Sequence, residues 1–230
     1  MNFPDALFPQ AWAFGAVLPL LLAWGWAVRT APWRRLGDSV QSNVWLGAIV
    51  VLTLVWSLRA GVKPGLDLHL LGAMAMTLMF GRQLAVIGLS LVLAAVSLNL
   101  SLRGIETWAA FALNALVLAV FPVFVAHGLW RLVERLLPAN FFVYVFLTGF
   151  FGAGLTVAAT GLLATLLLLA AGVYPAAMLF EDYFPYFILL GFSEAWLSGA
   201  AITLMVVYKP HWVATFDDRR YLWHKTRSEK

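Results

Sequence analysis

Six polar residues stand inside stretches of sequence that are otherwise apolar, and their side chains are the ones that could do chemistry. A carboxylate, imidazole or carboxamide in apolar surroundings is costly unless it is hydrogen-bonded, paired or used for binding. These positions are therefore the first candidates for a binding site. They are Asp67, His69, Asn99, Asn114, His127 and Glu194.

His69 is the most informative of the six. If it lies on a helix, Gly72, Ala73 and Met76 fall on the same face as the imidazole, which leaves room for another chain segment. Two interpretations stay open: a binding pocket, or a histidine hydrogen-bonded within a helix interface. Asp67 is expected to cap the start of that helix, or instead to orient His69.

Glu194 has small or polar neighbours one helical turn away on either side, Gly191 and Ser198. It is either a pocket carboxylate or a group that makes a helix–helix hydrogen bond. His127, beside charged residues, is interpreted as interfacial.

Three methionines that follow His69 could supply thioether ligands for Cu(I). Met74 and Met76 would point about 200° apart on a helix, so we expect Met74, Met76 and Met79 to pack in a core.

The sequence lacks the residues that several kinds of chemistry require. The chain has no cysteine, which excludes disulfides, thiolate metal sites and a cysteine nucleophile. It has no G-x-x-x-x-G-K-[ST] phosphate loop and no G-x-S-x-G elbow. The last apolar stretch lacks a lysine before Lys209, so a retinal Schiff base is not available. We expect no enzymatic activity and no cofactor.

The elements that position these residues are membrane spans. Of 230 residues, 63% are apolar and 11% are charged, far from the composition of a soluble domain, and the abundance of aromatic residues excludes disorder.

Spans of about 20 apolar residues predict an all-α polytopic helical bundle of about seven transmembrane helices in the cell (inner) membrane, with no nucleic-acid partner. They are placed at 10–28, 43–58, 66–81, 83–102, 108–130, 140–171 and 186–208. A tight turn at Gly81 is expected to separate the third from the fourth, and glycines in the sixth are expected to allow close packing or a bend.

The basic residues orient the bundle. With the N-terminus outside, twelve lysines and arginines fall in inner segments and three, Arg59, Lys63 and Arg103, fall in outer ones. This bias predicts an outer N-terminus and a cytoplasmic C-terminus. Residues 1–208 form one predicted membrane domain, and residues 209–230 form a basic cytoplasmic tail that contacts anionic lipid or docks a partner.

Four short motifs, in order along the chain, resemble those of one family. The start Met1-Asn2-Phe3-Pro4-Asp5 resembles M-H-[IM]-P-[DE], and residues 65–73, GLDLHLLGA, resemble G-[TS]-S-x-H-[LM]-x-G-[GA]. Asn114 matches a family asparagine, and residues 194–199, EAWLSG, resemble E-A-[VIL]-[IV]-[TS]-G. The sequence is similar in this way to the CbiM/NikM-type cobalt and nickel transport proteins, the substrate-binding (S) components of energy-coupling-factor (ECF) ABC transporters.

The resemblance implies a function and a site. It implies that residues 1–9 fold back into the bundle and that the metal is held by the Met1 amine, the Asn2 backbone nitrogen and His69, with Asp67, Asn114 and Glu194 supporting the pocket. The implied substrate is Co²⁺ or Ni²⁺, and a planar set of nitrogen ligands suits Ni(II) or Cu(II). The implied partners are a transmembrane coupling protein and ATPase subunits.

Asn2 departs from the family pattern, which has a histidine with a metal-binding imidazole at this position. Either the Asn2 side chain completes an altered site, or the substrate is not a bare metal ion. Two further functions stay open: capture of a small, vitamin-like organic substrate, and a membrane scaffold or assembly factor that does not transport.

Overall fold

A computed structural model describes residues 3–4, 7–63, 66–105 and 108–222. Helices dominate, and several α-helices continue into π-helical segments (η2, η3, η4), whereas η1 and η5 are short 3₁₀ turns. In chain order the elements are α1 (Gln10–Thr30), η1 (Trp33–Gly37), α2 (Ser39–Ser57), β1 (Ala60–Lys63), β2 (Leu66–Leu68), α3 (Ala73–Leu102), α4 (Phe111–Ala115), η2 (Leu116–Val120), α5 (Phe121–Leu136), η3 (Val143–Phe151), α6 (Gly152–Ala170), α7 (Ala176–Met178), η4 (Leu179–Tyr183), α8 (Phe184–Tyr208), η5 (Pro210–Trp212) and α9 (Asp218–Tyr221).

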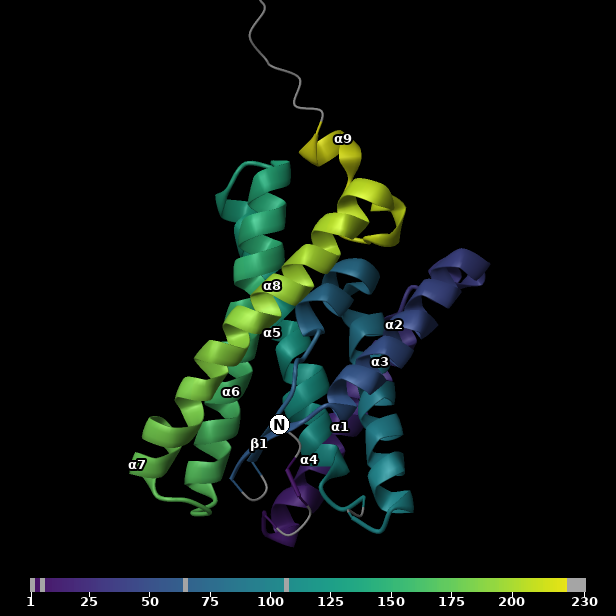
Figure 1. Ribbon diagram of the computed structural model, residues 1–230. Helices are drawn as coiled ribbons and strands as arrows, with labels where there is room; N and C mark the ends of the chain where they lie inside the picture. The colour runs from purple at the N-terminus through teal and green to yellow at the C-terminus, as the bar shows by residue number, and fades with distance from the viewer. Residues whose placement is uncertain (1–2, 5–6, 64–65, 106–107, 223–230) are drawn as a thin grey trace, which may run out of the picture.

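The predicted all-helical membrane bundle is confirmed (Figure 1). Among the described residues, six helical segments are long and apolar enough to cross a membrane: 10–30, 39–57, 73–102, 111–136, 143–170 and 176–208. The third predicted span, 66–81, is wrong over residues 66–72, and only its second half, residues 73–80, is helical. Residues 66–68 form strand β2, which pairs antiparallel with β1, and the helix begins only at Ala73.

Helix α3 is divided at Gly81 into a short arm, residues 73–80, and a long arm, residues 82–102. Gly81 has φ 79° and ψ 164°, which no helix accommodates. The arms fold against each other, since a Cβ on Gly88 would lie 2.6 Å from the Met76 methyl carbon. The predicted turn at Gly81 is confirmed. With eight residues the short arm is about 12 Å long, too short to cross the bilayer alone.

The loops gather at two opposite ends of the bundle (Figure 1). The β1–β2 hairpin and the start of α1 lie at what we call the hairpin end. Residues 29–38, residues 131–142 and α9 lie at the other end, which we call the basic end because most described arginines and lysines are there.

Helices α6 and α8 pack closely because glycines meet at their contact. A Cβ on Gly154 would lie 3.0 Å from the Gly191 carbonyl oxygen, and a Cβ on Gly191 would lie equally close to that of Gly154. Gly161 leaves space for the Phe187 ring. This is the small-residue packing that the sequence predicted for the sixth span.

The described part of the C-terminal segment packs onto the basic end. The backbone N–H groups of Ala214 and Thr215 donate to the carbonyls of Met79 and Leu78, at 3.0 and 3.2 Å. These carbonyls end the short arm of α3, so the segment after α8 satisfies acceptors that a helix end leaves open. Residues 223–230 of the predicted tail lie outside the described residues.

Candidate functional site

His69 lies in the irregular segment between β2 and α3, and its imidazole is buried. Its Nδ1 atom is 2.9 Å from the carbonyl oxygen of Leu70. A carbonyl only accepts, so Nδ1 carries the proton and Nε2 presents a lone pair. Nε2 is buried with no hydrogen-bond partner among the described residues. A histidine that donates one ring nitrogen to a carbonyl and leaves the other free has the arrangement of a metal-ligating imidazole.

Trp56, at the end of α2, fixes the position of the imidazole. The two rings are 4.6 Å apart between centroids, and Trp56 Nε1 donates to the Leu71 carbonyl oxygen at 3.2 Å. Trp56 is completely buried. The role of Trp56 was not predictable from the sequence, since a tryptophan near the end of an apolar span is typical of the membrane interface.

Glu194 of α8 holds the segment that follows His69. Its Oε2 accepts from the Leu71 N–H and its Oε1 from the Gly72 N–H, both at 2.7 Å. The Ser198 hydroxyl donates to the same Oε1 at 2.7 Å. These three hydrogen bonds place a buried carboxylate at the start of α3, where the helix dipole favours negative charge. Glu194 thus contacts the backbone beside His69 and fixes its path.

Gly72 allows the chain to turn from that segment into α3. Its φ is +69°, a left-handed conformation, and a Cβ there would lie 2.5 Å from a methyl carbon of Leu52. Gly72, and not Asp67, precedes the first helical residue. The predicted capping role of Asp67 is therefore wrong, because the helix starts five residues later than a cap at Asp67 would require.

Asp67 lies on β2, and its side chain lies near Gly61 of the paired strand β1. Its Oδ2 is 3.6 Å from Nη1 of Arg59, and its side chain is 34% exposed. The structure gives no direct contact between Asp67 and His69. Side chains two positions apart on a strand point to the same face, but His69 lies beyond the end of β2, so this rule does not place it beside Asp67.

Asn114 of α4 binds the N-terminal segment. Its Oδ1 accepts from the Phe3 N–H at 2.8 Å, and its Nδ2 donates to the Phe3 carbonyl oxygen at 2.9 Å. Phe3 is buried and its ring packs against that of Phe8, with centroids 4.8 Å apart. Both polar atoms of the Asn114 side chain are thus used to anchor the chain three residues from its start.

Two predicted ligands, Met1 and Asn2, lie outside the described residues. Within the described residues, no three His, Asp or Glu side chains gather closely enough to hold a metal ion. A metal site that uses His69 would therefore need ligands other than the His, Asp and Glu side chains of the described residues.

The methionines near His69 pack against glycines of other helical segments. The Met74 methyl carbon lies 2.5 Å from where a Cβ on Gly152 of α6 would be, and the Met76 methyl carbon lies 2.6 Å from where a Cβ on Gly88 of the long arm of α3 would be. Both side chains are buried. They fill the core, as the sequence predicted.

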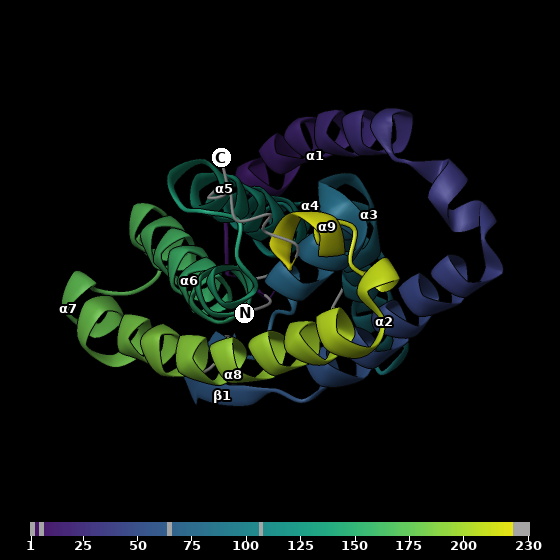
Figure 2. The same cartoon turned by 90° about the horizontal axis from the view of Figure 1, so that it is seen from above.

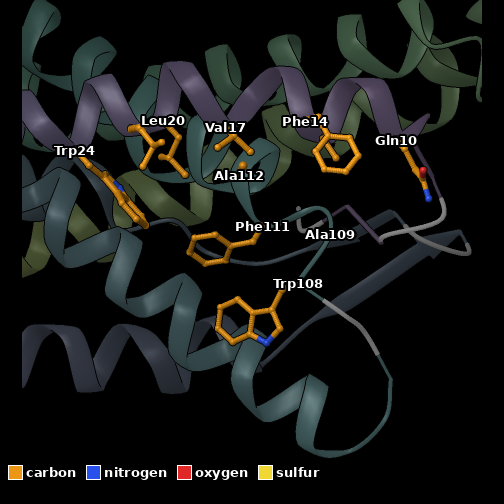
Figure 3. A pocket seen from close by; sticks show the side chains of 11 residues that line it. Gln10, Phe14, Val17, Leu20, Trp24, Trp108, Ala109, Phe111 and Ala112 are labelled. Atoms are coloured by element: carbon orange, nitrogen blue, oxygen red, sulfur yellow. The ribbon is translucent and has the colours of Figure 1, made fainter.

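An apolar groove of about 490 Å³ lies apart from His69, between α1 and residues 108–112 (Figure 3). Phe14, Leu20, Trp24 and Phe111 are among the side chains that line it. It has no titratable side chain and includes none of the predicted site residues, so it is not the candidate site.

Comparisons with known proteins agree on the fold. Residues 2–212 match the family model CbiM, described as the cobalt uptake substrate-specific transmembrane region. The crystal structure of a truncated transition metal transporter has a TM-score of 0.75 at 16% identity, over 90% of this chain and 99% of that one. The crystal structure of a transition metal transporter has a TM-score of 0.75 at 18% identity, over 89% of this chain and 92% of that one. A comparison with curated protein sequences finds no match.

Proposed function

Because this chain belongs to the CbiM family of cobalt uptake proteins, we propose that it is the substrate-capture subunit of an ECF-type transporter for a transition-metal cation, Co²⁺ or Ni²⁺. It is a multi-pass membrane protein with six candidate spans in its described residues. Its sequence has no phosphate loop, so ATP hydrolysis would come from partner ATPase subunits through a coupling protein.

The observation that carries the proposal is that Nε2 of His69 has no hydrogen-bond partner among the described residues. A buried nitrogen without a hydrogen-bond partner costs roughly 1–3 kcal/mol, and a bound cation would remove that cost. The ring is already oriented by Leu70 and Trp56, so binding would require little further ordering.

The remaining ligands in this proposal are the Met1 amine and the Asn2 backbone nitrogen. Anchoring of Phe3 by Asn114 supports it, because the Met1 amine nitrogen can lie no farther than about 7 Å from the Phe3 backbone nitrogen at roughly 3.5 Å per residue. The Asn2 carboxamide takes the place of the family imidazole, so we expect weaker binding than with a histidine at this position.

Glu194 and Asn114 act as positioning residues in this proposal. Glu194 fixes the backbone after His69 from α8, and Asn114 fixes the N-terminal segment from α4. Their two anchors approach the site from different helices, and both would have to hold for the ligands to converge. Asp67, which pairs with Arg59, would contribute negative charge near the site.

The test is isothermal titration of the purified protein with Co²⁺ and with Ni²⁺. We expect His69→Ala, and a chain with residues added before Met1, to lose binding, and Asn2→His to strengthen it. His211→Ala is the matched control, because His211 is exposed at the basic end.

Undiminished binding in both the His69→Ala and the extended chains would contradict the proposed site. Binding of a vitamin-like compound that metal does not compete with would favour an organic substrate. Absence of all binding, together with failure to assemble with ATPase subunits, would favour the scaffold function.

A further inference from the structure

A second polar feature lies at the basic end, away from His69. It is a cavity of about 620 Å³ between the start of the long arm of α3 and the last turns of α5. Arg82 enters it from α3, and His127, Arg131 and Arg135 enter it from α5. The three α5 residues are spaced by four, so they lie on one face of the helix. No carboxylate is among the residues that line the cavity.

The nearest carboxylate, Glu134, is directed largely toward the C-terminal segment. It accepts from Arg220 at 2.6 Å and from the Tyr221 hydroxyl at 3.0 Å, whereas Arg131 is 3.4 Å away. Burial, together with the Glu134 charge, raises the pKa of Tyr221 to about 12, so this hydroxyl remains a donor. Among the described residues, Arg82 and Arg135 have no carboxylate in ion-pair contact, which leaves the cavity strongly positive.

The face of α5 that carries these arginines continues toward the middle of the bundle as an apolar groove. The groove, about 430 Å³, runs along α4, η2 and α5 from Leu113 to Phe124, with Leu163 of α6 on its other wall. Leu113 and Phe124 are eleven positions apart, which in a helix is about 16 Å, or half of a hydrocarbon core of about 30 Å. The groove therefore has the length of one acyl chain in one leaflet.

Trp26 of α1 contacts one residue of the arginine-lined cavity and one residue of the apolar groove. Its ring lies 5.4 Å from the Phe124 ring and 5.1 Å from the Arg82 guanidinium carbon. Figure 2, viewed along the bundle, shows α5 between α1 and α6, and Phe124, which lines the groove, is exposed. A tryptophan at this level is typical of the boundary between the hydrocarbon and the headgroups.

We propose that this surface binds one anionic phospholipid, with its phosphate against Arg82, Arg131 and Arg135 and an acyl chain along the apolar groove. Guanidinium groups suit the planar, two-point recognition of phosphate oxygens, and basic pockets between helices are a known form of headgroup site. The groove distinguishes a lipid from a soluble phosphate, which would need only the arginines.

The experiment is native mass spectrometry of the purified chain in neutral detergent, with dioleoyl phosphatidylglycerol, dioleoyl phosphatidylcholine or glycerol 1-phosphate added. We expect a single, tight phosphatidylglycerol adduct and little binding of the other two. Arg131→Gln/Arg135→Gln should weaken phosphatidylglycerol binding about 25-fold, at about fivefold for each basic side chain near an anionic headgroup. Arg34→Gln/Arg219→Gln removes the same charge elsewhere at the basic end and should change binding less than about twofold.

Equal affinity for phosphatidylglycerol and phosphatidylcholine would overturn the proposal, and so would equal loss in the control. Tight binding of glycerol 1-phosphate would replace the lipid with a soluble phosphate. If the Arg131/Arg135 variant kept the lipid but lost assembly with ATPase subunits, the cavity would instead be a protein-docking surface. Should that variant not be recovered folded, Arg82→Gln alone provides the same test with an expected loss of about fivefold.

Discussion

The anchoring of Phe3 by Asn114 gives the sharpest prediction about this protein. Asn114→Ala removes a hydrogen bond to the Phe3 N–H and another to the Phe3 carbonyl oxygen, both buried. Each such bond stabilises by about 1 kcal/mol net, so the anchored conformation loses about 2 kcal/mol. If metal binding needs that conformation, the affinity falls by at most about 30-fold, because the loss cannot exceed the anchoring energy.

Two measurements check this prediction. Hydrogen exchange at the Phe3 amide should accelerate in Asn114→Ala, and the affinity for Co²⁺ or Ni²⁺ by titration calorimetry should fall while the melting temperature changes little. Asn99→Ala is the matched control, because Asn99 is exposed near the end of the long arm of α3. It should leave both quantities unchanged.

An unchanged affinity with an accelerated Phe3 exchange would contradict this prediction, since binding would then not depend on the anchor. A lost affinity with unchanged exchange would also refute it, because Asn114 would then act on the substrate directly.

Two further predictions concern the segment after His69. Glu194→Gln leaves one buried N–H facing an amide donor, so the free energy of unfolding should fall by about 1–3 kcal/mol. The control Glu181→Gln, at an exposed position, should change the free energy of unfolding by less than about 0.5 kcal/mol. A thermal melt of both variants tests this. Gly72→Ala puts a Cβ on a residue with a left-handed φ and against the Leu52 side chain, so the free energy of unfolding should fall by about 2–4 kcal/mol. Gly104→Ala has a similar φ of +68° but open space around the Cβ, so the free energy of unfolding should fall by only about 1 kcal/mol. Equal costs at the two glycines would show that Leu52 relaxes and that only the backbone conformation matters.

The membrane class, most of the helical segments and the family could be predicted from the sequence. Hydropathy and charge are properties of a one-dimensional stretch, so apolar runs between loops are visible without knowing what they pack against. The resemblance based on four short motifs is confirmed by the family match over residues 2–212. The turn at Gly81 was also predictable, because one uninterrupted helix through it would exceed the bilayer.

The helix predicted for the third apolar stretch was wrong over residues 66–72, which form strand β2 and a loop. Residues 66–81 are apolar because they are buried, and burial in protein also permits irregular backbone at membrane depth. Hydropathy cannot distinguish a buried loop from a helix, so the helical face assumed for His69 does not exist. The structure shows the imidazole on a loop that Trp56 and Glu194 hold.

What the sequence determined by itself was therefore which few polar groups had to find partners in so apolar a chain. Which partners they found was decided only by tertiary structure. Asn114 meets Phe3 across 111 positions of sequence, and Glu194 meets Leu71 across 123. Such contacts depend on how each helix is rotated and how closely glycines let its neighbours approach, and this information resides in the packing of all the helices together.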